Sequence, residues 1–120
     1  MNTMQSVFLS CRKVAALAMG TAAIICSSTV IAAEAEHTLI IQEHRFQPAE
    51  LVVPSGTKIK LSVENRDSTP EEFESHDLNR EKVIAGKSTA TIFVGPLAPG
   101  RYRFYGEFNE KTAQGVIVAQ

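Results

Sequence analysis

The sequence predicts an all-β protein, built as a sandwich of six to eight short strands. From residue 36 onward, short runs of β-branched or alternating apolar residues are separated by Pro and Gly. No stretch of this region keeps a helical periodicity over enough residues to place a helix. Short strands that recur about every ten residues, with turn signals between them, are typical of a β-sandwich.

Six segments can be placed as individual strands: residues 37–43, 50–54, 58–65, 88–95, 101–108 and 115–120. Turn chemistry separates several of them. Residues 54–56 (PSG), 85–87 (AGK) and 97–100 (LAPG) each supply a Gly for positive φ or a Pro for a preset turn.

Three of these strands alternate, and the alternation predicts which side meets the core. Their apolar faces are Ile59, Leu61 and Val63 in the first, Ala90, Ile92 and Val94 in the second, and Tyr102 and Phe104 in the third. Phe93 lies on the opposite face of the second strand, so that strand alternates less cleanly.

Residues 1–35 have the features of a secretory signal peptide, because Arg12 and Lys13 precede an apolar run that ends in small residues. Cleavage after Ala32 and cleavage after Ala35 both fit. We place the boundary after Ala35, which leaves residues 36–120 as one domain. The competing interpretation is an uncleaved membrane anchor, since a spanning helix needs about 20 apolar residues. The Ser and Thr residues in the second half of the run argue against it, so no stable membrane insertion is expected after cleavage.

Removal of this leader would leave the domain without sulfur. Both cysteines, Cys11 and Cys26, and all three methionines lie within residues 1–35. The domain therefore has no disulfide and no thiolate or thioether ligand for a soft metal. It carries 10 Lys and Arg against 12 Asp and Glu, a net charge of −2 with the signs interspersed. Nucleic-acid binding is excluded because a basic patch is missing.

Three motifs follow one another along the chain: FQPAELVVPSGTKIKLSVEN (46–65), GPLAPGRYRFYGEF (95–108) and AQGVIVA (113–119). In this order they resemble the cupredoxin family. The resemblance covers about residues 38–119 and implies a Greek-key β-sandwich.

Type 1 blue copper needs two His, a Cys and a weak axial Met. Aligned with the metal-binding loop of the family, this chain has Gly106 at the Cys position, Asn109 at the His position and Ala113 near the Met. The other family His would fall near Glu71 and Glu72. The resemblance therefore implies the fold without type 1 blue copper.

Glu72-Phe73-Glu74 is followed by Arg80-Glu81 and a Gly turn. These residues carry a closer resemblance, to the EfeO-type and FtrB-type periplasmic cupredoxin domains of bacterial ferrous-iron uptake. It implies a periplasmic protein that handles copper or iron beside a membrane iron permease or a periplasmic iron-binding protein. The cysteines of EfeO-type domains near the positions of Phe46 and Tyr105 are absent here, so the ligands of that relative do not carry over.

The stretch EEFESH (71–76) holds the first candidate metal ligands. If it is extended, Glu72, Glu74 and His76 share one face and Phe73 anchors the other face in the core. Alternate positions on a strand are about 7 Å apart, so convergence on an ion needs a neighbouring segment. In the cupredoxin fold that neighbour is the loop GEFNE, where Glu107 is the best partner and Asn109 a weaker one.

His44 is the remaining candidate ligand. It precedes Phe46 by two residues and would share its face, which places the imidazole in the core or near the metal loop. The alternative for His44 is a core-edge histidine bonded to backbone. The alternative for the acidic residues is a solvated rim, paired with Arg80, Lys82, Arg101 or Arg103. Beside the candidate ligands, Glu71 and Asp77 are interpreted as bystanders, with an outer-shell role left open for Glu71.

Carboxylate, imidazole and amide groups suit iron, divalent copper or manganese better than monovalent copper. The sequence therefore predicts a copper-binding or iron-binding protein with ligands among Glu72, Glu74, Glu107, His44 and His76. The alternative is a metal-free secreted sandwich that acts as a protein-interaction module. A motif for enzymatic chemistry is missing. The one enzyme hypothesis is a copper-dependent ferroxidase that works with partners.

Overall fold

The computed structural model describes Gly20, residues 24–29 and residues 34–120. Within these residues the chain forms nine β-strands in two sheets and one short 3-10 turn, which confirms the all-β prediction. The elements are β1 (Ala35–Gln42), β2 (Arg45–Gln47), β3 (Glu50–Val53), β4 (Ile59–Asn65), β5 (Glu71–Ser75), β6 (Arg80–Ile84), β7 (Ser88–Val94), β8 (Gly100–Gly106), η1 (Glu107–Asn109) and β9 (Gln114–Ala119).

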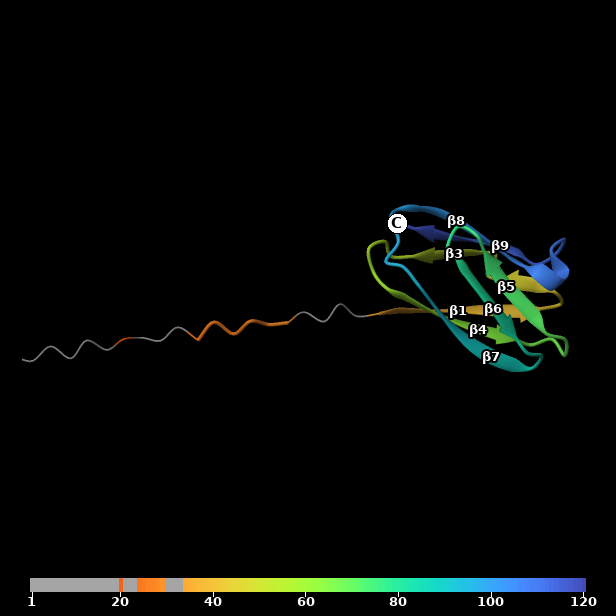
Figure 1. Ribbon diagram of the computed structural model, residues 1–120, viewed down its shortest axis with the longest axis horizontal. Coiled ribbons are helices and arrows are strands. Elements are labelled where there is room, and N and C mark those ends of the chain that lie inside the picture. The colour runs from red at the N-terminus through yellow and green to blue at the C-terminus, as the bar shows by residue number, and fades with distance from the viewer. Residues whose placement is uncertain (1–19, 21–23, 30–33) are drawn as a thin grey trace, which may run out of the picture.

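The strands form a four-stranded sheet in the order β2-β1-β4-β7 and a five-stranded sheet in the order β3-β9-β8-β5-β6. The pairs β1–β4 and β3–β9 are parallel, and the other ladders are antiparallel. Figure 1 shows the two sheets wrapped around a shared core, with η1 at the end of the sandwich opposite the C-terminus.

All six strands placed from the sequence are present within two residues of their expected bounds. The structure adds β2, β5 and β6, which the sequence did not place as strands of their own. β2 is only three residues long. β6 is an edge strand whose first four residues are exposed, so it lacks the alternation that reveals a half-buried strand.

The core lies between the sheets and follows the predicted faces. Ile59, Leu61 and Val63 are fully buried, whereas Phe93 is 43% exposed on the outer face. Three aromatic rings meet at the centre of the core. Phe73 stacks on Phe104 at 5.1 Å between ring centroids, and Phe46 packs edge-on against both. Such ring pairs stabilise the core beyond the area they bury.

Most of the predicted signal peptide lies outside the described residues. Ala35 is the first residue of β1, pairs with Ile59 and donates its N–H to Lys58 O at 3.1 Å. Cleavage after Ala35 would remove this residue from the strand, and cleavage after Ala32 would keep it. Among the residues that the structure describes, no helix has the length and hydropathy to span a membrane.

Candidate metal centre

Strand β5 separates two kinds of side chain by its pleat. Glu71, Phe73 and Ser75 are buried, whereas Glu72 and Glu74 are partly exposed on the outer face. This is the consequence of the two-residue period of a strand. The predicted role of Phe73 as the core anchor of this segment is confirmed.

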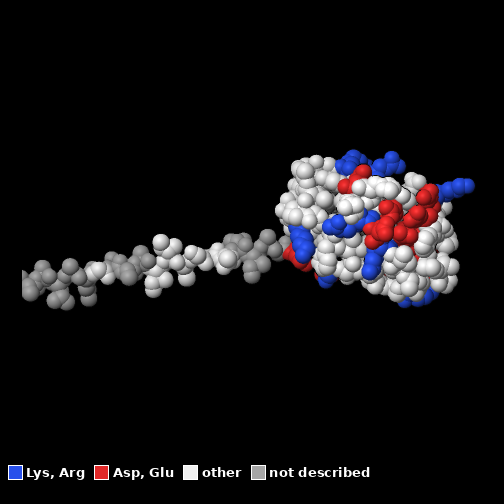
Figure 2. Space-filling model, in the orientation of Figure 1, with Lys and Arg blue, Asp and Glu red and all other residues white. Residues whose placement is uncertain are grey.

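The fold brings Glu107 to the same outer face. Phe73 of β5 pairs with Gly106 at the end of β8, and Glu107 follows directly as the first residue of η1. The carboxylates of Glu72, Glu74 and Glu107 each offer an oxygen atom, and these atoms lie within 4.8 Å of one another. Figure 2 shows the acidic side chains gathered on this side of the domain, over β5 and η1. Three of the five predicted ligands are thus brought together.

In residues 34–120, this cluster forms no ion pair with Lys or Arg. In residues 34–120, no Lys or Arg nitrogen lies within 4.0 Å of the three carboxylates, and the ion pairs with Lys or Arg form elsewhere. Arg80 donates instead to the carbonyl oxygens of Phe93 and Asn79. Partial removal from water, and then the nearby charges of Glu107 and Glu81, raise the pKa of Glu72.

His76 lies beside the cluster but does not continue the strand. β5 ends at Ser75, and the His76 side chain is 80% exposed in the following turn. Its Nδ1 atom is 3.7 Å from Glu74 Oε1, and its Nε2 atom is 3.1 Å from the Tyr105 hydroxyl. Partial burial and then Glu74, followed by other glutamates, raise the pKa of that hydroxyl. An imidazole and a phenol therefore border the carboxylates on the Glu74 side.

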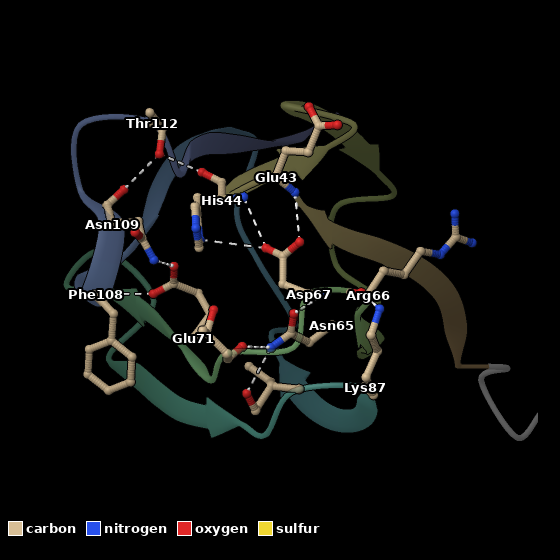
Figure 3. A network of polar contacts seen from close by, with 12 residues as sticks. Glu43, His44, Asn65, Arg66, Asp67, Glu71, Lys87, Phe108, Asn109 and Thr112 are labelled. Atoms are coloured by element: carbon tan, nitrogen blue, oxygen red, sulfur yellow. Dashed lines mark hydrogen bonds and ion pairs between the residues drawn. The ribbon is translucent and has the colours of Figure 1, made fainter.

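The expectation that His44 shares the buried face of Phe46 is wrong. Glu43 and His44 form the turn between β1 and β2, with φ values of 52° and 56°, and this reversal breaks the alternation. The imidazole is exposed, with Nδ1 3.6 Å from Asp67 Oδ2. Figure 3 shows His44 facing Asp67. Within the described residues, the group of potential metal ligands that lie close together does not include His44.

Asp67 stabilises the turn that holds His44. Its carboxylate accepts the backbone N–H groups of Glu43 at 2.8 Å and His44 at 3.0 Å (Figure 3). The hydrogen bond from His44, with smaller contributions that include the one from Glu43, lowers the pKa of Asp67.

Asp67→Asn is expected to lower the free energy of unfolding by about 1–2 kcal/mol at neutral pH, because an amide cannot accept both bonds as an anion does. A carboxyl whose folded pKa is lowered stabilises the fold above its unfolded pKa, and this stabilisation disappears as the pH falls through the folded value. Chemical denaturation of both proteins at several pH values measures the difference. A difference that stays constant down to the lowest pH would contradict this role of the charge.

Glu71 is the residue whose importance the sequence did not reveal. It is not a bystander, because its residue exposure is 1% and its carboxylate accepts three hydrogen bonds. Asp77 also has a structural role, since its Oδ2 atom accepts the backbone N–H of Arg103 at 2.7 Å. One feature of the sequence did indicate this position. Glu71 lies two residues before Phe73, so on a strand both side chains point to the same, buried face.

Gly106 lies directly against Glu71. A Cβ atom added at Gly106 would be 2.6 Å from Glu71 Cδ and 2.7 Å from Ala113 Cβ. Both neighbours are buried. The structure therefore has no space for a larger side chain at the end of β8.

The two-sheet fold agrees with comparisons to known proteins. A family model described as a cupredoxin-like domain matches residues 14–119. The chain belongs to this family. Its cupredoxin-like domain is also similar to the uncharacterized protein RP394 of Rickettsia prowazekii (strain Madrid E), with 46% identity over 83 residues. The match covers 69% of this chain and 66% of that protein, so the chain spans just under two thirds of the relative.

Solved structures show the same fold at low sequence identity. Auracyanin A, a "blue" copper protein from Chloroflexus aurantiacus, matches this cupredoxin-like domain with a TM-score of 0.64 and 13% identity. The match covers 73% of this chain and all of that one (100%). A purple cupredoxin from Nitrosopumilus maritimus matches with a TM-score of 0.54 and 19% identity, over 69% of this chain and 98% of that one.

Proposed function

We propose that this cupredoxin-like protein binds a divalent copper or iron ion through Glu72, Glu74 and Glu107. The observation that carries the proposal is the convergence of three carboxylate oxygens within 4.8 Å, on residues from two separate segments. His76 is the neighbouring nitrogen donor, 3.7 Å from Glu74. His44 is left out of the proposed ligand set because its imidazole faces Asp67.

Electrostatics supports a cation at this place. Three carboxylates without a Lys or Arg ion pair repel one another. Partial removal from water, and then the charges of Glu107 and Glu81, raise the pKa of Glu72. A divalent ion between them would remove the repulsion and supply the missing positive charge. Oxygen donors with one imidazole favour iron, divalent copper or manganese over monovalent copper.

We further propose that the protein carries no type 1 blue copper. The described domain, residues 34–120, has no cysteine. The position that corresponds to the thiolate of blue copper proteins is Gly106, where a Cβ atom would strike the Glu71 carboxylate. The residues present therefore do not fit this group, and no electron-transfer step through it is proposed.

The proposed setting is the periplasm, reached through residues 1–35 as a signal peptide. There the protein would bind iron or copper beside a ferrous-iron or copper transport system. The proposed partners are a membrane iron permease or a periplasmic iron-binding protein. The proposed role is metal delivery or oxidation, and ferrous-iron oxidation would need a partner that accepts the electron. The support is the family together with the acidic cluster.

Titration calorimetry of the full chain with Cu²⁺, and with Fe²⁺ in the absence of oxygen, tests metal binding. We expect one site with a dissociation constant of about 1 μM or lower for at least one ion. Glu72→Gln and Glu107→Gln should each weaken that binding about tenfold or more, which corresponds to about 1.4 kcal/mol. Glu50→Gln is the matched control, because Glu50 is an exposed carboxylate paired with Arg101. Equal losses in all three variants, or no binding by the wild-type protein, would overturn the proposal.

The same Glu72→Gln variant has an expected signature without metal. Because the folded pKa of Glu72 is raised, ionised Glu72 destabilises the fold, and this cost grows as the pH rises above the ordinary range for Glu. The variant should therefore be more stable than the wild type at neutral pH while it binds metal more weakly. Because carboxylate ligands must lose their protons to bind metal, metal affinity should fall on acidification from a pH above the ordinary pKa of Glu.

A second candidate function is protein interaction, supported by two exposed apolar side chains beside the acidic cluster. Phe108 follows Glu107 and is 50% exposed, and Val83 pairs across from Glu72 and is 52% exposed. Acidic groups flanked by apolar ones suit a basic partner protein. Calorimetry separates the two functions, since a metal-free module would give no binding heat with either ion.

A further inference from the structure

Glu71 is a buried carboxylate that links the two segments of the acidic cluster. Its Oε1 atom accepts the backbone N–H of Glu72 at 3.0 Å and the backbone N–H of Phe108 at 2.9 Å. Its Oε2 atom accepts the side-chain amide of Asn109 at 2.6 Å. Figure 3 shows the carboxylate directed toward Phe108 and Asn109 from β5. All three partners are donors, as an acceptor-only carboxylate requires.

Two of these bonds involve the backbone of a proposed ligand or of its direct neighbour. The bond from Glu72 N–H holds the backbone from which the Glu72 side chain leaves. The bond from Phe108 N–H holds the residue directly after Glu107, within the short turn η1. One buried group thus fixes the backbone on both sides of the cluster. A shift of either segment would separate carboxylate oxygens that now lie within 4.8 Å.

The loop after β8 is built around this carboxylate. Gly106 donates its N–H to Ala113 O at 2.8 Å, and Ala113 donates its N–H to Asn109 O at 2.8 Å, so the loop closes on itself. Inside the loop, the Glu71 carboxylate accepts hydrogen bonds from the Phe108 N–H and the Asn109 side-chain amide. The absent side chain of Gly106 leaves the space that Glu71 occupies, because a Cβ atom there would lie 2.9 Å from Glu71 Oε1.

We infer that Glu71 is a positioning residue, which presets the spacing between Glu72 and Glu107 so that their carboxylates are placed before any ion arrives. The expected effect on metal affinity rests on the proposed function. The immobilisation of the loop by Glu71 does not depend on it. Loss of a group that holds metal ligands in place typically weakens metal binding by roughly 10-fold to 100-fold.

The test compares two substitutions that remove the same charge. In Glu71→Gln, the Gln oxygen can accept the two backbone N–H groups. The Asn109 amide can turn to present its oxygen to the Gln nitrogen. Glu71→Ala loses all three bonds. Positioning predicts Cu²⁺ affinity close to wild type in Glu71→Gln and about tenfold weaker in Glu71→Ala. Equal weakening in both variants would show an effect of charge alone and overturn the inference.

Asp67→Asn controls for general loss of stability. It weakens a different turn, where the Asp67 carboxylate likewise accepts two backbone N–H groups. It should leave Cu²⁺ affinity unchanged. If Glu71→Ala does not fold, Asn109→Ala replaces it, since that variant removes one of the three bonds without a change of charge. It should weaken Cu²⁺ binding less than Glu71→Ala but measurably, and unchanged binding would contradict the positioning role.

Amide hydrogen exchange without metal separates this inference from the proposed function. The Phe108 amide should exchange faster in Glu71→Ala than in the wild type, Glu71→Gln and Asp67→Asn proteins. If the wild type binds neither ion but this exchange pattern is found, the proposed function fails while the loop is still held by Glu71. If the Phe108 amide exchanges equally in all four proteins, the inference fails whatever the metal affinity.

Discussion

Replacement of Phe73 by Ala is expected to lower the free energy of unfolding by about 3–5 kcal/mol. Phe73 is fully buried, stacks on Phe104 at 5.1 Å and packs edge-on against Phe46 at 6.1 Å. The substitution would open a cavity at the centre of the three rings, and β-sheets on both sides limit how far it can collapse. Urea denaturation followed by circular dichroism measures the loss.

Phe108→Ala is the matched control for this prediction. Phe108 lies close to the same site but is 50% exposed, so its removal should change stability by no more than about 0.5 kcal/mol. A similar loss in both variants would show that Phe73 is not the anchor of β5. Because Glu72 and Glu74 flank Phe73, metal binding by Phe73→Ala should also weaken, and the Phe108 variant should keep it.

Gly106→Ala is expected to destabilise the fold by about 1–3 kcal/mol, the usual cost of an extra methyl group in a filled core. The added Cβ atom would lie 2.6 Å from Glu71 Cδ and 2.7 Å from Ala113 Cβ. Either the carboxylate or the loop must move, so Cu²⁺ affinity should fall together with stability. Thermal denaturation and calorimetry measure the two effects.

Gly100→Ala is the control within the same strand, because an added Cβ atom there is 3.7 Å from the nearest atom, a ring carbon of Tyr102. That is an ordinary contact, and little change is expected. Gly106→Cys extends the test by placing a thiol at the position of the family thiolate. It should be destabilised in the same way and should give no intense blue absorption with Cu²⁺. A stable blue protein would refute the geometry described for Gly106 and Glu71.

Much of the candidate site could be predicted from strand parity. The two-residue period placed Phe73 inside and Glu72 and Glu74 outside, and the structure has this arrangement. The approach of Glu107 followed from the resemblance to cupredoxins, because the loop after the Tyr-x-Phe strand lies beside this segment in that fold. The alternation of side chains depends only on near neighbours, so it predicts the buried face wherever a strand continues.

Parity failed where the strand did not continue. Alternation predicts that His44 shares the face of Phe46, but Glu43 and His44 turn the chain with positive φ. Neither residue is a glycine, which would have indicated the turn. His76 was counted as a strand residue, but the strand ends at Ser75. Its imidazole lies beside Glu74 and contacts the hydroxyl of Tyr105, from β8, at 3.1 Å.

The sequence by itself determined the all-β class, the six main strands and their core faces, because these depend on spacing between near neighbours. Only the tertiary structure decided what surrounds the carboxylates. It placed Glu107 next to Glu72, left the cluster without a Lys or Arg ion pair in residues 34–120, and buried Glu71 against donors from residues 108 and 109. A buried carboxylate depends on donors that arrive from distant segments. Its role therefore becomes visible only when those segments are in place.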